Sequence, residues 1–274
     1  MALQLDGVLV LAGAGNMGGA LLAGWMDRGL DPARIIVQDP SPPPRIAGLL
    51  AKHGVRVVTE VPRLGEPPAV LLMAVKPQVM EEVFPPLAAH AGKNTVILSV
   101  AAGRTIRSFE RHLAPGAAVV RSIPNTPAAV GRGITVATAN PHVSAGQKQV
   151  CQDLLSAVGE TAWVDDEALI DPVTAVSGSG PAYVFYLAEC LAEAGVKAGL
   201  APDLAAKLAR WTVAGAGELL HRSDLPANVL REDVTSPNGT TFAALQVLMA
   251  KTGLQPVMTE AVLAASRRSK ELAG

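Results

Sequence analysis

The chain has 274 residues, of which 49% are apolar, and it carries 23 basic side chains against 24 acidic ones. This length is enough for two modest domains, each with a core of its own. The balanced charge, without clustered Lys or Arg, excludes a protein that binds nucleic acid or an acidic membrane through a basic surface.

The first predicted elements are a short strand, Val8–Ala12, and a helix, Gly18–Arg28. Residues 8–26 carry no charge and have the hydropathy of a signal peptide or a membrane span. However, Asp6 precedes them and no Lys or Arg does, so the basic segment that begins a signal peptide is missing. We therefore expect the segment to be buried inside the protein, with no membrane insertion.

Short β-branched segments continue to alternate with helical ones, such as Arg45–Lys52, through the first half of the chain. Near-continuous apolar strands that alternate with helices are typical of a parallel sheet covered on both faces, that is, a Rossmann-type doubly wound sheet. The other predicted strands are Ile35–Gln38, Val55–Val58, Val70–Val75, Val96–Val100, Ala118–Arg121, Ile134–Ala137 and Thr161–Val164.

A glycine motif follows the first strand at once and opens the first helix. It reads Gly13-Ala14-Gly15-Asn16-Met17-Gly18. In a dinucleotide-binding turn the first glycine permits the tight bend, the second lets the backbone approach the pyrophosphate, and the third lets the helix pack on the strand. The motif also occurs in purely structural turns. Its strand–turn–helix setting favours cofactor binding by Gly13, Gly15, Asn16, Met17 and Gly18.

Asp39 ends the second strand, where a carboxylate accepts hydrogen bonds from the adenosine ribose and repels a 2′-phosphate. Ser41 and Arg45 are the nearest side chains able to hold such a phosphate. We expect NAD(P)H as the cofactor, with NADH slightly favoured because of Asp39. The alternative is a solvated aspartate in the loop that begins at Pro40.

Three further loops follow the carboxyl ends of strands, where ligands bind in open α/β sheets. Lys76 in the first of them is either a cofactor contact or a surface lysine. The third loop begins at Asn125, within reach of the nicotinamide region. The predicted cofactor contacts in these loops are Ala74, Val75, Lys76, Pro77, Ala101, Ala102 and Asn125.

The pattern changes near Asp165. The remaining sequence contains no convincing strand, only Ala- and Leu-rich helical segments at Ala182–Ala198, Asp203–His221, Thr240–Lys251 and Pro256–Leu272. We predict a dinucleotide-binding domain over residues 1–165 and an all-helical domain over residues 166–274. Helices that are apolar on all sides indicate burial by more than their own chain, and so an oligomer.

Two turns in this second half precede helices and present small hydroxyl residues. One is Ser177–Pro181, with proline at the first helical position, and the other is Thr235–Thr241. Free backbone N–H groups at a positive helix end make each turn a candidate carboxylate site. Each is also compatible with an ordinary helix cap.

Other chemistries lack their motifs. No HExxH, CxxC, GxSxG or P-loop is present, so we expect neither a metal site nor a nucleophilic enzyme. The five histidines have no acidic partner nearby in sequence and are expected at the surface. Cys151 and Cys190 are expected to be reduced, mostly buried thiols of a cytoplasmic protein.

Together these segments resemble the pyrroline-5-carboxylate reductase family over essentially the whole chain. The resemblance rests on GAGNMG from Gly13, AVKP at Lys76, SVAAG from Ser99, PNTPAAVGRG from Pro124, AVSGSGPAYVF from Ala175 and DVTSPNGTT from Asp233. It implies reduction of 1-pyrroline-5-carboxylate to L-proline by NAD(P)H. It also implies a helical dimerisation domain, a homodimer that assembles further into a decamer, and a substrate carboxylate held by the loop of Ser236, Gly239, Thr240 and Thr241, with Ser177 nearby.

The resemblance also implies that the Thr241 hydroxyl bonds the ring nitrogen, which makes Thr241 the expected catalytic residue. The family usually has glycine at Asn238. Asn tolerates left-handed backbone better than most residues, so we expect the turn to survive.

Two alternatives remain at this stage. A β-hydroxyacid dehydrogenase shares the two-domain plan and uses a helix lysine, for which Lys197 is the nearest candidate. A non-catalytic NAD(P)-sensing protein keeps the glycine motif but loses the substrate loop, which here is intact apart from Asn238.

Overall fold

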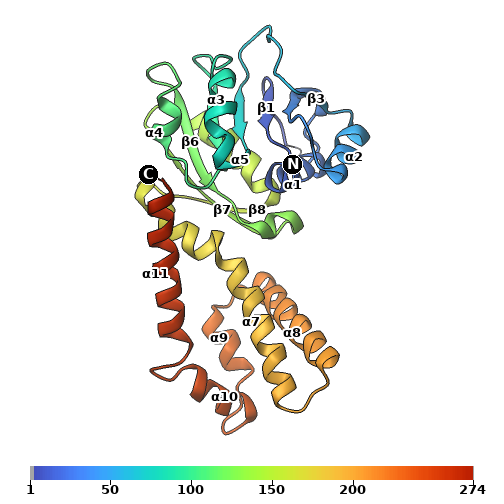
Figure 1. The fold of residues 1–274 in the computed structure, drawn as a ribbon, viewed down its shortest axis with the longest axis vertical. Coiled ribbons are helices and arrows are strands. Elements are labelled where there is room, and N and C mark those ends of the chain that lie inside the picture. Colours follow the sequence, from blue (N-terminus) through green and yellow to red (C-terminus); the bar gives the residue numbers. More distant parts are fainter. Residues whose placement is uncertain (1–2, 274) are drawn as a thin grey trace. The chain divides into compact units, whose positions relative to one another are not determined.

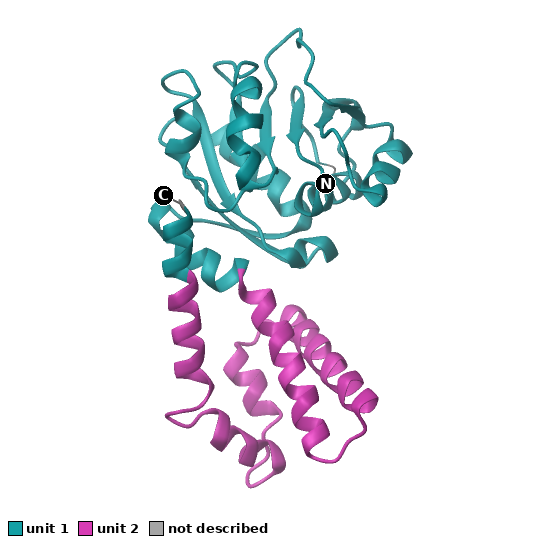
Figure 2. Ribbon diagram, viewed as in Figure 1, with its two compact units in different colours: residues 1–178, 266–274 teal, residues 179–265 magenta. Residues whose placement is uncertain are grey.

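The structure, a computed structural model, describes residues 3–273, which divide into two compact units (Figure 2). Unit 1 runs to Gly178 and takes up the chain again from Ser266. Unit 2 is Ser179–Ala265. The predicted domain boundary after residue 165 stays a prediction. Unit 1 extends beyond it because Ile170 packs beneath the sheet on Ile123 and Val136.

Unit 1 is built on one eight-stranded sheet in the order β3-β2-β1-β4-β5-β6-β7-β8 (Figure 1). The chain adds strands on one side of β1 and then crosses to the other side with β4. This reversal creates a topological switch point between β1 and β4. The strands are β1 Leu9–Ala12, β2 Ile35–Gln38, β3 Arg56–Val58, β4 Val70–Met73, β5 Val96–Ser99, β6 Ala118–Ile123, β7 Gly133–Ala139 and β8 Gly159–Trp163. All eight predicted strands are present.

The sheet is not parallel throughout, which corrects the prediction. From β3 to β6 every neighbouring pair is parallel, but β7 runs antiparallel to β6, with Ser122 opposite Ala137. β8 is again parallel to β7. A parallel return requires a crossover of a dozen or more residues. Residues 124–132 contain only a short 3-10 turn, Thr126–Val130, so the chain reverses direction there.

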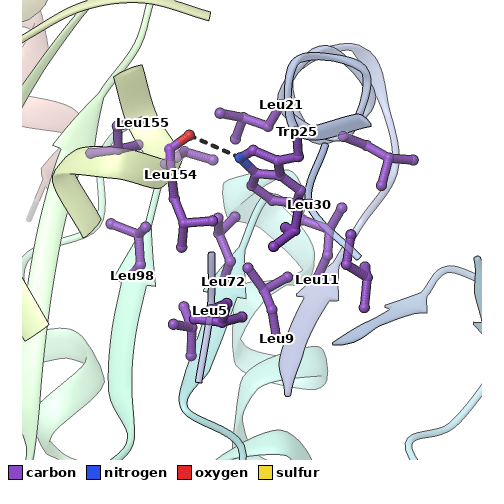
Figure 3. Packing of buried hydrophobic residues seen from close by; sticks show 14 of the residues in the cluster. Leu5, Leu9, Leu11, Leu21, Trp25, Leu30, Leu72, Leu98, Leu154 and Leu155 are labelled. Carbon is purple, nitrogen blue, oxygen red and sulfur yellow. Dashed lines mark hydrogen bonds between the residues drawn. The ribbon is translucent and has the colours of Figure 1, made fainter. Parts of the chain in front are cut away.

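Helices cover both faces of the sheet, as a doubly wound fold requires. Leu9 and Leu11 of β1 face one core, and Val10 and Ala12 face the other. On the first side Trp25 is fully buried and its indole N–H donates to the Leu154 carbonyl at 2.9 Å (Figure 3). The helices of unit 1 are α1 Asn16–Asp27, α2 Pro44–His53, α3 Met80–Ala88, α4 Ile106–Glu110, α5 Ala145–Leu155 and α6 Ile170–Val173.

Unit 2 is entirely helical over the residues described, and no strand follows β8, as predicted. Its helices are α7 Gly180–Lys197, α8 Pro202–Arg222, α9 Ala227–Asp233, α10 Thr240–Leu248 and the first part of α11 Leu254–Ala273. None of the helices in the described part of the chain is long and apolar enough to cross a membrane.

Candidate dinucleotide and carboxylate sites

The glycine loop lies at the switch point, held between the ends of neighbouring strands. Gly13 N–H donates to the Gln38 carbonyl at 2.9 Å, and Ala74 N–H donates to the Ala12 carbonyl at 2.8 Å. These bonds bring the carboxyl ends of β1, β2 and β4 to one edge of unit 1. The predicted cofactor residues in these three loops therefore share one edge of the sheet.

Each glycine of the motif meets a different environment. Gly13 has φ +90°, and a Cβ there would lie 2.9 Å from the Ala74 carbonyl oxygen. A Cβ on Gly18 would lie 2.1 Å from the Gly13 carbonyl oxygen, so only glycine lets α1 pack this closely. A Cβ on Gly15 would meet nothing within 4 Å. Gly13 and Gly18 are thus required by the chain itself, whereas Gly15 borders open space.

The N-terminus of α1 fits an anionic group. Gly15 is its N-cap, no side chain caps the helix, and no acidic residue lies in the first turn. Asn16 is exposed and Met17 half-buried. The first N–H groups of a helix carry partial positive charge and need acceptors. Together with the open space at Gly15, these groups match a pyrophosphate.

Asp39 has a role that the sequence did not reveal. One oxygen of its carboxylate accepts the Ala14 N–H at 2.7 Å, and the other accepts the Ser41 N–H at 2.9 Å. Asp39 therefore ties the glycine loop to the loop after β2. Each carboxylate oxygen retains a second lone pair, so a ribose hydroxyl can still donate to Asp39. Arg45 is exposed in the first turn of α2.

The loops after β4, β5 and β6 place the remaining predicted contacts. Lys76 is exposed, Ala101 is buried, and Ala101 N–H donates to the Ser99 hydroxyl at 3.2 Å. Asn125 is half-buried, and its side-chain oxygen accepts the Ile134 N–H at 3.0 Å. Asn125 thereby joins the end of β6 to the start of β7. Of the other loop residues, Ala102 is exposed, and Ala74, Val75 and Pro77 are half-buried.

The loop before α10, in unit 2, keeps its turn. Asn238 has φ 57° and is the only non-glycine residue with positive φ among those described, as expected from its tolerance of left-handed backbone. Gly239 N–H donates to the Ser236 carbonyl at 3.0 Å, and a Cβ on Gly239 would lie 2.3 Å from the Ser236 hydroxyl. No side chain caps α10 and its first turn holds no acid, so the N–H groups of Thr240 and Thr241 have no intrahelical acceptor.

Ser177 does not lie in a turn, contrary to expectation. Residues Thr174–Gly178 form a π-helix that continues α6, and the Ser177 hydroxyl donates to the Val173 carbonyl at 3.0 Å. This segment belongs to unit 1, whereas the loop before α10 belongs to unit 2. π-Helical turns are rare and occur frequently at functional sites.

A buried ion pair was missed by the sequence analysis. Arg121, in the middle of β6, is buried and donates to the Glu167 carboxylate at 2.8 Å. The same carboxylate oxygen accepts the Ile106 N–H at 2.8 Å, at the start of α4. An arginine inside an apolar strand was the available signal, but its partner is distant in sequence.

Among the described residues, the cysteines and histidines form no cluster that could hold a metal ion. Cys151 is buried as expected, and burial raises the pKa of its thiol to about 12. Cys190 is exposed on α7, which corrects the expectation of burial. His112 lies 3.3 Å from Glu81, an acidic partner that is distant in sequence.

Unit 2 leaves an unusual amount of apolar surface uncovered. No residue of α7 or α10 is buried, and in α8 only Ala205 and Ala209 are. Trp211 is 70% exposed, and Val247 is 71% exposed. Soluble monomers rarely leave such contiguous apolar surface in water, so these helices have the composition of an interface.

Comparisons with known proteins agree along the whole chain. Residues 167–272 match the family model described as pyrroline-5-carboxylate reductase dimerisation, and residues 8–103 match the model described as NADP oxidoreductase coenzyme F420-dependent. Pyrroline-5-carboxylate reductases from Pseudomonas aeruginosa and Synechocystis are each 41% identical to this chain. The alignments cover 97% of this chain and 96% of the first relative, and 99% of both this chain and the second.

Solved structures give the same result. A pyrroline-5-carboxylate reductase from Coxiella burnetii has a TM-score of 0.90 and 33% identity over 98% of this chain and 100% of its own. A pyrroline carboxylate reductase from Plasmodium falciparum, solved with NADP bound, has a TM-score of 0.80 and 27% identity over 98% of this chain and 99% of its own.

Proposed function

Because the chain belongs to the pyrroline-5-carboxylate reductase family, we propose that it reduces 1-pyrroline-5-carboxylate to L-proline with NAD(P)H, the last step of proline biosynthesis. The observation that carries this proposal is the loop before α10. Its left-handed Asn238 preserves the turn that the family builds with glycine, and α10 begins without a cap.

We assign the cofactor to the switch-point edge of unit 1. The pyrophosphate would lie against Gly15 and the first N–H groups of α1, where a Cβ meets open space and no acid opposes it. The proposed contacts on the nicotinamide side are Ala74, Val75, Lys76, Pro77, Ala101, Ala102 and Asn125.

We also propose a preference between NADH and NADPH. Asp39 favours NADH because its charge repels a 2′-phosphate, and Ser41 and Arg45 are the side chains available for NADPH. Both carboxylate oxygens of Asp39 already accept backbone N–H groups, which weakens its bond to a ribose. We therefore expect only a slight preference for NADH.

We assign the substrate carboxylate to the N-terminus of α10. Gly239 N–H is already donated within the turn, so the N–H groups of Thr240 and Thr241 and the Ser236 hydroxyl are the remaining donors. Gly239 contributes by letting the Ser236 hydroxyl lie close to the turn. Ser177, in unit 1, is a further proposed substrate contact.

The reaction adds a hydride to the imine carbon and a proton to the ring nitrogen, so that C=N becomes CH–NH. The nicotinamide supplies the hydride when bound. A protonated cyclic imine is already electrophilic, so the protein mainly has to align it and neutralise its carboxylate. The Thr241 hydroxyl, placed at the ring nitrogen, would orient the proton transfer. This division of labour needs no catalytic histidine or metal.

Paired kinetics on two variants test these roles. Thr241→Val keeps the shape and the backbone N–H but deletes the hydroxyl. If that bond strengthens in the transition state, kcat should fall about ten- to a hundredfold. Ser236→Ala should mainly raise KM, since its carboxylate contact is similar in ground and transition states. Wild-type kcat in Thr241→Val would remove the hydroxyl from the reacting nitrogen.

Assembly follows from the apolar face of unit 2. We propose that a second copy covers α7, α8 and α10, and that such dimers associate further into a decamer. The family model for residues 167–272 is named for dimerisation, which supports the dimer. The reduced state expected of Cys151 and Cys190 fits a cytoplasmic enzyme.

The β-hydroxyacid dehydrogenase alternative loses its candidate base. Lys197 lies at the exposed end of α7, and its ammonium pairs with Glu193 at 2.8 Å. Two assays separate the two enzyme activities. One measures steady-state reduction of pyrroline-5-carboxylate with NADH and NADPH in parallel, and the other measures oxidation of 3-hydroxyisobutyrate. The absence of turnover with every one of these substrates would favour a sensing protein.

A further inference from the structure

A hollow opens in unit 1 beside α4, next to loops assigned to the cofactor. It has a volume of about 800 Å³, within the range of small-molecule sites. Its lining includes three arginines, Arg104, Arg107 and Arg111, and the hydroxyl residues Thr105 and Ser108. All of its lining residues belong to unit 1.

The three arginines are only partly neutralised. Arg107 lies in α4, Arg104 precedes the helix and Arg111 is its C-cap, so three like charges gather around one short helix. Glu81 is the acidic partner: it pairs with Arg104 and lies 3.9 Å from Arg111. Slight burial raises the pKa of Glu81, but hydrogen bonds from Arg104 and His112 outweigh it, so the pKa is lowered and Glu81 is ionised. Arg107 has no ion partner among residues 3–273.

The backbone beneath these arginines is fixed. Thr105 caps α4, with its hydroxyl accepting the Ser108 N–H at 3.2 Å. The Ile106 N–H is held by Glu167, which is itself paired with buried Arg121. The arginines therefore project from a backbone segment that is already fixed before a ligand binds. A preorganised site loses less entropy when it binds a ligand.

We propose that this hollow is a second binding site, for a small organic polyanion that carries two phosphate or carboxylate groups. Arg107 and Arg111 are its principal charge partners, because Arg104 is already engaged by Glu81 and by the Pro77 carbonyl. The planar guanidinium fork matches the oxygens of either anion. Thr105 and Ser108 also line the hollow, although the Ser108 hydroxyl already donates to the Thr105 carbonyl at 2.6 Å.

The position of the hollow gives the site a regulatory character. Pro77 and Ala102 border it, and both also belong to loops assigned to the cofactor. If the cofactor changes the position of these loops, a ligand that contacts them would have a different affinity for the cofactor-bound and the cofactor-free enzyme. By linkage, the cofactor then changes the affinity for the ligand by the same factor.

Calorimetric titration of the full-length protein with pyrophosphate, and separately with citrate, tests the site. The protein is first saturated with NADP⁺, so that the glycine loop is occupied. We expect saturable binding that weakens about tenfold or more in Arg107→Gln/Arg111→Gln. Both arginines are exposed, with Arg111 62% so, and the variant should fold. Arg34→Gln/Arg63→Gln removes two exposed arginines that have no ion partner in the described structure; it is the charge-matched control and should bind like wild type.

The relative strength of the two probes identifies the ligand chemistry. Tighter pyrophosphate binding indicates phosphate groups, and tighter citrate binding indicates carboxylates. The proposal is overturned if neither probe binds, if the double variant binds as tightly as wild type, or if saturation with NADP⁺ abolishes binding, which would make the anion a competitor for the cofactor site.

Discussion

Replacing Gly15 by alanine separates what the glycine loop does for the fold from what it does for the cofactor. Gly15 has φ −69°, which alanine adopts freely, and its Cβ would meet no protein atom within 4 Å. The fold should therefore be unaffected. The new methyl group would occupy the space assigned to the pyrophosphate and displace it from the N–H groups of α1.

The expected loss is one charge-assisted hydrogen bond or somewhat more. That corresponds to about 2–3 kcal/mol, or roughly thirty- to 150-fold in the dissociation constant of NADP(H). Calorimetry on the purified protein measures the affinity, and thermal unfolding without cofactor measures the fold. We expect the Tm to change by less than about 2 °C, since the surrounding packing is untouched.

Two other glycines supply the comparison. Gly18→Ala puts a Cβ 2.1 Å from the Gly13 carbonyl oxygen, a backbone atom, so stability should fall by about 3 kcal/mol and Tm by roughly 6–12 °C. Gly48→Ala, in the exposed interior of α2 with nothing within 4 Å, should stabilise by about 0.5–1 kcal/mol. The reasoning fails if Gly15→Ala keeps wild-type affinity, or loses as much stability as Gly18→Ala.

Three further predictions concern charge, assembly and pH. Asp39→Ser should raise the preference for NADPH about tenfold, or about 1.4 kcal/mol, and weaken both cofactors because the Ala14 N–H loses its acceptor; an unchanged ratio of the two KM values would contradict this. Trp211→Arg, at a 70% exposed site on α8, should dissociate the oligomer in sedimentation velocity, whereas a wild type found only as a 28 kDa monomer at micromolar concentration would refute the interface. Burial raises the pKa of Cys151 from 9.0 to about 12, so the stability gained from the neutral thiol is complete below about pH 9 and is lost toward pH 12. The difference in unfolding free energy between wild type and Cys151→Ala should therefore narrow over that window, and a constant difference would exclude the effect.

Local patterns predicted most of the fold. The strands were identified as short runs rich in apolar or β-branched residues. β1, β2, β4 and β5 are almost fully buried, whereas no residue of β3 or β8 is buried. α3 was not predicted, since Pro85 and Pro86 interrupt its pattern, although Phe84 anchors it against Phe109 with ring centroids 4.9 Å apart. The direction of β7 was also missed, because strand pairing depends on the length and shape of a connection and not on the strand's own residues.

The candidate sites were predictable where a motif occupies consecutive positions. Gly13 to Gly18 and Ser236 to Thr241 are of this kind. The bond from Asp39 to Ala14 and the chain from Arg121 through Glu167 to Ile106 join residues that are distant in sequence. The hollow beside α4 was missed for the same reason, since Glu81 and the arginines meet only in the folded sheet.

In the sequence, unit 2 is inserted between two segments of unit 1, and this order affects how the chain folds during synthesis. The chain leaves unit 1 at Gly178 and returns at Ser266, where the Ser269 hydroxyl donates to Asp171 at 2.7 Å. At roughly 5–20 residues per second on the ribosome, the sheet can form several seconds before this last contact exists. The nascent sheet must therefore persist without its final segment while the apolar helices of unit 2 emerge, and this interval is when a chaperone would be most useful.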